Sequence, residues 1–140
     1  MEIEIKRIIT NEFQHDGFTL FDLNDLEKYL NEKFTEKNYG ESVVKYFFGF
    51  ELYKFDGGFA QFFNNDIESW KFKSKWLVTN THFDWNEMIK LNRKEVFEVI
   101  KVEFLNSVNR IENMARKPKS FDFKAFRKDL EMVLNGYEVK

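Results

Sequence analysis

The sequence predicts an all-α protein in which five or six helices surround a core rich in phenylalanine. Apolar residues recur at helical spacing over about residues 93–115 and 122–135, and neither stretch contains an internal Gly or Pro. Breaks between helices are expected at Gly40, at Gly57-Gly58 and at Pro118. Phenylalanine accounts for 18 of the 140 residues, so we expect a core built from rings. Residues 1–140 are expected to form one domain, because that length can bury a core of its own.

The N-terminal half is expected to hold two helices after a short lead-in. Ile3 and Ile5 alternate with charged residues, which allows a short extended segment. Asp22 or Asn24 can cap a first helix. Its inward side chains would be Leu23, Leu26, Leu30 and Phe34. A second helix is expected over about residues 43–55. Its inward side chains would be Val44, Phe47, Phe48, Leu52 and Phe55.

The remainder is also expected to be mainly helical. Residues 60–78 are predicted to be helical in part, and Thr79-Asn80-Thr81 is predicted to be a loop. Asp84 would begin a further helical segment. The clearest helix follows at about 93–115, and the last, at about 122–135, would end at Gly136.

Composition and missing motifs exclude several classes of function. The chain has no Cys, which removes thiolate catalysis and thiolate metal sites. It has no phosphate-binding glycine loop and no Gly-x-Ser-x-Gly elbow. We therefore expect no enzyme activity, no cofactor and no metal. The charged N-terminus and the lack of a long apolar run predict a cytoplasmic protein with no membrane contact.

The only Gly-Gly pair lies between two aromatic segments, in the block Asp56-Gly57-Gly58-Phe59-Ala60-Gln61-Phe62-Phe63-Asn64. Its Gln and Asn side chains would either tie the glycine turn to neighbouring helix ends or line a notch that faces a partner. The block resembles the signature of the bacterial DNA-mimic protein family (DMP-type), formerly a domain of unknown function, over about residues 43–66. Asp56 stands where that signature has Asn. The resemblance implies a small helical protein that binds a DNA-binding protein through an acidic surface.

Charge is distributed unequally along the chain. Residues 1–66 carry 13 acidic and 7 basic side chains, a net charge of −6, whereas residues 67–140 have a net charge of +4. The acidic half would present either a phosphate-like stripe or an ordinary solvated helix face. The residues concerned are Asp22, Asp25, Glu27, Glu32, Glu36 and Glu41.

The resemblance implies a bacterial protein-binding module that inhibits or neutralises a partner, either a DNA-binding protein or a toxin. Carboxylates would steer association and aromatic side chains would anchor it. The expected partner-binding residues are Asp22, Asp25, Glu32, Glu36, Asp56, Phe59, Gln61, Phe62 and Asn64. The aromatic-rich composition also allows a homo-oligomer.

Two alternatives remain open. The first is direct nucleic-acid binding through the basic C-terminal third, where rings are interleaved with cations. Its basic residues are Arg110, Arg116, Lys117, Lys119, Lys124, Arg127 and Lys128, with Phe121 and Phe123 between them. The second is a small hydrolase-like enzyme that uses His82, Asp84 and Glu87 as its catalytic group. A capping box formed by Asp84 and Glu87 would explain those two residues without catalysis.

Overall fold

The protein is a mixed α/β fold, and the all-α prediction is wrong. A computed structural model describes residues 1–9, 23–40, 43–53, 68–88 and 90–139. Its strands are β1 (Glu2–Ile9), β2 (Lys45–Tyr53), β3 (Glu68–Lys71) and β4 (Trp76–Asp84). Its helices are α1 (Leu23–Phe34), the single turn α2 (Trp85–Met88), α3 (Arg93–Glu112) and α4 (Phe123–Asn135).

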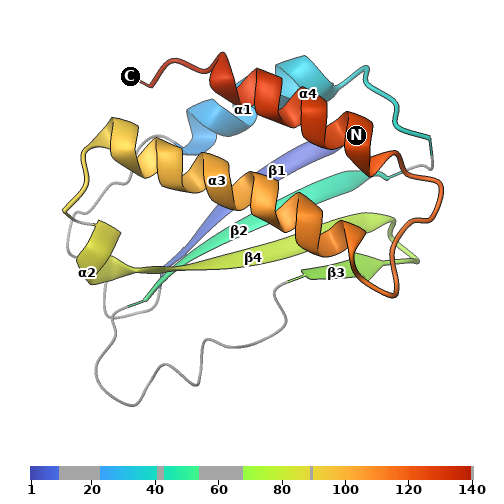
Figure 1. Cartoon of the computed structure of the whole chain (residues 1–140), viewed down its shortest axis with the longest axis horizontal. Coiled ribbons are helices and arrows are strands. Elements are labelled where there is room, and N and C mark those ends of the chain that lie inside the picture. The colour runs from blue at the N-terminus through green and yellow to red at the C-terminus, as the bar shows by residue number, and fades with distance from the viewer. Residues whose placement is uncertain (10–22, 41–42, 54–67, 89, 140) are drawn as a thin grey trace.

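The four strands form one sheet in the order β1-β2-β4-β3. β2 pairs in parallel with both β1 and β4, whereas β3 pairs with β4 in an antiparallel hairpin. The three long helices cover one face of this sheet, with α3 and α4 side by side (Figure 1). Among the described residues, none of the helices has the length and apolar character that crossing a membrane requires.

The helix predicted over residues 43–55 is the central strand β2. Tyr46, Phe48 and Phe50 are buried at every second position, which is the period of a strand. Aromatic side chains also favour strands over helices. Val44, expected to face inward, is 49% exposed. β2 has a parallel partner on each side, so it is an interior strand of the sheet. A run of aromatic residues suits such a strand better than it suits a surface helix.

Two neighbouring predictions are wrong for a similar reason. The partly helical stretch at 60–78 contains β3 and the start of β4, while residues 60–67 lie outside the described part. The predicted loop Thr79-Asn80-Thr81 is the middle of β4, where both threonines are buried. β-Branched threonine fits a pleated, half-buried surface, so these polar residues do not mark a loop here.

The amphipathic helices and the extended lead-in were predicted correctly. α1 buries the four expected apolar side chains, and α3 and α4 fall within the predicted ranges 93–115 and 122–135. Asn92 and Glu95 form a capping box at the start of α3, with bonds of 2.9 and 3.0 Å. Gly136 follows α4 as its cap, although its φ of −87° is one that other residues adopt readily.

The core is a set of rings between β2 and the helices. Phe50 lies 5.3 Å from Phe104 of α3, and Tyr46 lies 5.3 Å from Phe126 of α4, between ring centroids. Phe34 of α1 contacts Phe126 edge-on at 5.6 Å. These rings link all three long helices to one strand, and such pairs stabilise beyond the area that they bury.

A charged contact joins the strands on the other face of the sheet. The Lys45 ammonium lies 2.7 Å from a Glu4 carboxylate oxygen and 4.4 Å from the centroid of the Trp76 ring. The hydrogen bond to Glu4 raises the pKa of Lys45 above its ordinary value. Glu4, Lys45 and Trp76 belong to three adjacent strands, so this contact supports the order of the sheet.

We predict that Phe48→Ala is strongly destabilising. Phe48 is 1% exposed and packs against Phe104, so its loss leaves a cavity costing about 3–5 kcal/mol of unfolding free energy. Urea denaturation would measure the change. The matched control is Phe72→Ala, because Phe72 is 75% exposed and its loss should change stability by no more than about 0.5 kcal/mol. Equal effects of the two substitutions would contradict this description of the core.

We also predict a loss of stability at alkaline pH that depends on Tyr46. Burial raises the pKa of Tyr46 far above its ordinary value, although its hydroxyl lies 3.3 Å from that of Ser107. The unfolded chain releases this proton at about pH 10 while the folded chain retains it, so the unfolding free energy falls as pH rises further. Urea denaturation between about pH 8 and about pH 11 should show a shallower fall for Tyr46→Phe. An unchanged slope would contradict the prediction.

Candidate functional site

The predicted acidic residues that the structure describes do not share one role. The Asp25 carboxylate accepts a 2.7 Å hydrogen bond from the Tyr137 hydroxyl, so it ties the start of α1 to the segment after α4. Glu27 likewise accepts a 2.7 Å bond from the backbone of Ile5 and joins α1 to β1. Glu32 is exposed near the end of α1, and Glu36 is exposed just after it. Glu32 and Glu36 are therefore the members of this group left most open to a partner.

Basic residues are interspersed among these carboxylates. Lys28 and Lys33 are exposed on α1 itself. Lys37 follows and lies 3.9 Å from the Asp129 carboxylate of α4. The described surface along α1 is thus of mixed charge rather than continuously acidic.

The remaining predicted partner-binding residues lie outside the described part of the chain. These are Asp22, Asp56, Phe59, Gln61, Phe62 and Asn64. Their role stays a prediction.

The residues of the alternative catalytic group lie on β4 and α2. His82 is half-buried in β4, whereas Glu87 is exposed on α2 and lies 3.9 Å from the ammonium of Lys90. Asp84 ends β4, immediately before α2. Across the described residues there is no group of three or more His, Cys, Asp or Glu able to hold a metal. Neither His82 nor Glu87 lines the pockets next to Phe121, Tyr137 or Phe72.

Part of the basic C-terminal third is engaged within the fold. The Arg110 guanidinium pairs with Glu68 and lies 3.7 Å from Glu103, and Arg127 lies 3.1 Å from Glu112. The rings at positions 121 and 123 are each only 6% exposed, so they face the core. Aromatic stacking of a nucleic-acid base on those two rings is therefore excluded.

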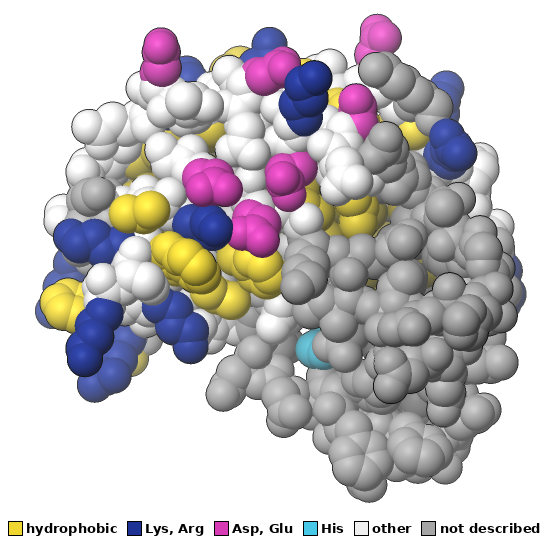
Figure 2. All heavy atoms as spheres, turned by 180° about the vertical axis from the view of Figure 1, so that it is seen from behind, with side chains coloured by type: hydrophobic (Ala, Val, Ile, Leu, Met, Phe, Trp, Pro, Cys, Tyr) yellow, Lys and Arg dark blue, Asp and Glu magenta, His cyan; other side chains and the backbone are white. Residues whose placement is uncertain are grey.

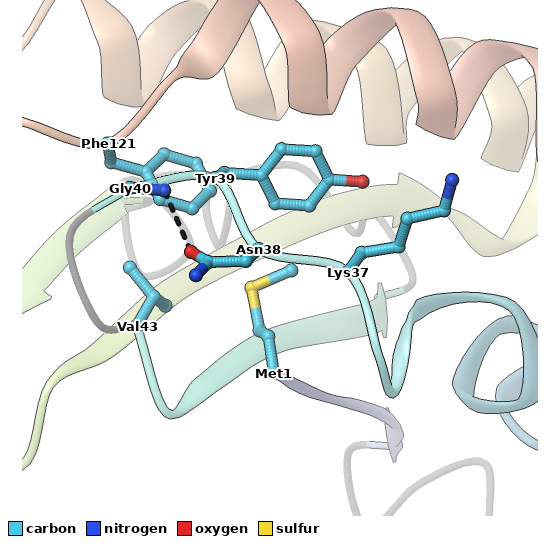
Figure 3. Close-up of a pocket in the computed structure, with 7 residues that line it drawn as sticks. All are labelled: Met1, Lys37, Asn38, Tyr39, Gly40, Val43 and Phe121. Carbon is cyan, nitrogen blue, oxygen red and sulfur yellow. Dashed lines mark hydrogen bonds between the residues drawn. The ribbon is translucent and has the colours of Figure 1, made fainter.

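A pocket of about 280 Å³ opens where the segment after α1 meets the start of α4 (Figure 3). It is lined by Met1, Lys37, Asn38, Tyr39, Gly40, Val43 and Phe121. The Tyr39 hydroxyl donates a 2.7 Å hydrogen bond to Asp129. Burial, and then this bond, raise the pKa of Tyr39 well above its usual range, so the hydroxyl stays a donor. The lining of the pocket combines apolar side chains with the polar Asn38 and the exposed cation Lys37.

Little in the sequence indicates this pocket. The sequence predicts only a break between helices at Gly40, but Gly40 pairs with Phe121, which is 81 positions away along the chain. The backbone N–H of Asp122 also donates to the Tyr39 carbonyl at 2.6 Å. Such a bridge between distant segments has no local sequence signal beyond the glycine itself.

We predict that Gly40→Ala disrupts this pocket. Gly40 has a φ of +99°, and a Cβ there would meet the backbone carbonyl of Ser120. The strain should cost about 1–3 kcal/mol, measurable by urea denaturation. Gly136→Ala is the control. Gly136 has an unstrained φ of −87°, so this substitution should cost less unfolding free energy. An equal loss of unfolding free energy in both variants, or no loss in Gly40→Ala, would show that the bridge between Gly40 and Phe121 is not tightly constrained.

Comparison with known families identifies the class of protein. The chain matches the model of a family of immunity proteins over residues 1–136. It belongs to the family described as Immunity protein 44. No curated protein and no solved structure matches it. The match supports an immunity-protein family and not the DNA-mimic family that the Gly57-Gly58 block resembles. The prediction of a DNA-mimic protein is therefore wrong.

Proposed function

We propose that this protein neutralises a protein toxin by binding it directly, without chemistry of its own. The observation that carries the proposal is the family match, which spans nearly the whole chain. Of the two partner classes expected from the sequence, it favours a toxin over a DNA-binding protein. The fold suits this role, because a rigid ring-packed core holds short surface segments in fixed positions and lowers the entropy cost of binding.

Charge should steer the encounter. Glu32 and Glu36 are exposed at the end of α1, whereas Asp25 is engaged by Tyr137. We propose that Glu32 and Glu36 attract basic residues of the toxin, which would raise the association rate more than the final affinity. This interaction would weaken as salt screens the charges.

Capture followed by reconstitution tests the proposed function. The tagged protein is used to capture partners from a lysate of its source cells at low and at high salt. The captured protein is then expressed alone and together with this chain. We expect the captured protein alone to arrest growth, co-expression to restore it, and the purified pair to form a stoichiometric complex. A captured protein that is harmless, or toxicity that persists despite a stable complex, would contradict the proposal.

We predict that Glu32→Lys/Glu36→Lys slows association with the toxin by about tenfold at low salt, while the dissociation rate changes little. Stopped-flow or surface-based kinetics would measure both rates. The matched control is Glu131→Lys/Glu138→Lys, which reverses the charge at two exposed positions outside α1. If both double variants associate equally fast, Glu32 and Glu36 do not steer binding.

A further inference from the structure

A groove of about 660 Å³ opens between the β3–β4 hairpin and the segment that joins α3 to α4. Trp70 and Phe72 line it from the hairpin side. Arg116, Lys117 and Lys119 line it from the connecting segment. An aromatic wall thus faces a basic wall, and the two walls come from segments more than 40 positions apart in the chain.

Phe72 is the most exposed large apolar side chain of the described residues, at 75%. Its neighbour Trp70 is half-buried and packs against the core. The hairpin turn is tight, with Lys75 at a φ of +59° and its N–H donating to the Lys71 carbonyl at 2.7 Å. Aromatic side chains beside a groove are among the residues that anchor protein partners.

Positive charge around the groove is not neutralised within the described part of the chain. Five exposed cations of the hairpin and the connecting segment form no ion pair with any described residue: Lys71, Lys73, Lys75, Arg116 and Lys119. Of these, Arg116 and Lys119 line the groove. The nearby carboxylates Glu68 and Glu112 are already engaged by Arg110 and Arg127. Figure 2 shows Lys and Arg side chains gathered at one end of the molecule, at the lower left of that view.

We propose that this groove binds an acidic segment of the toxin. Carboxylates of the segment would lie against Arg116 and Lys119, and an apolar side chain would cover Phe72. The inference rests on the proposed function and adds a contact separate from Glu32 and Glu36. α1 packs on β1, whereas the groove adjoins β3 at the opposite edge of the sheet.

A protein segment fits this groove better than a nucleic acid. Nucleic-acid binding needs cations that follow an extended phosphate backbone. Among the described residues only three cations line the groove, Arg116, Lys117 and Lys119, and the chain's net charge of −2 would repel the rest of a long polyanion. The family match likewise favours a protein partner.

Fluorescence anisotropy with labelled octaglutamate tests the groove without the toxin. We expect salt-sensitive binding that weakens at least about tenfold in Arg116→Glu/Lys119→Glu. The matched control, Lys124→Glu/Lys128→Glu, makes the same charge change on α4 and should weaken binding less than about twofold. Phe72→Ala keeps every charge and, with an exposed side chain, keeps the fold. The affinity of this variant is measured for an octaglutamate that carries one central tryptophan. We expect Phe72→Ala to weaken that binding.

Three results would overturn the proposal. The wild-type protein could fail to bind the acidic peptides, or the two double variants could weaken binding equally. Labelled oligothymidylate could also bind more tightly than octaglutamate and be lost in the same groove variant, which would make the groove a nucleic-acid site.

The toxin assay separates this proposal from the proposed function. If wild-type protein fails to protect cells from the captured toxin, the proposed function fails whatever the peptides do. If wild-type protein protects, and both Phe72→Ala and Arg116→Glu/Lys119→Glu bind the toxin as tightly as wild type, the groove proposal alone fails.

Discussion

The packing of the β2 rings against the helices is the contact on which the rest of the structure depends. Phe48 and Phe50 fix α3 through Phe104, and Tyr46 fixes α4 through Phe126. Once the two helices are placed, the segment between them is held at both ends. That segment lines the groove beside Phe72 and also the pocket beside Tyr39. The packing of the core therefore determines where the groove and the pocket lie.

Charge is arranged differently at the two edges of the sheet. At the β1 edge, carboxylates of α1 bond to Tyr137 and to the Ile5 backbone, and exposed acidic and basic residues alternate. At the β3 edge, the exposed cations of the hairpin and of the α3–α4 segment form no ion pair within the described part of the chain. The +4 half of the sequence thus includes cations that no described carboxylate neutralises, whereas the described residues of the −6 half form a surface of mixed charge.

The sequence predicted the helices well and the sheet poorly, and the reasons are physical. α1, α3 and α4 each have one apolar face, so their 3.6-residue period is visible in the chain. Central β2 has apolar residues at consecutive positions, and a run such as Tyr46–Phe50 fits either period. The groove could not be predicted, because nothing local shows that Phe72 is exposed or that Arg116 lies across from it.

Hydrogen–deuterium exchange of the isolated protein and of its complex with the toxin would show where the toxin binds. We expect direct binding at fixed surface segments, without remodelling of the core, to neutralise the toxin. Peptides covering residues 70–76 and 115–120 should become protected in the complex, while those of β2 should exchange as before. Unchanged exchange in both surface segments, or faster exchange in β2, would contradict the account.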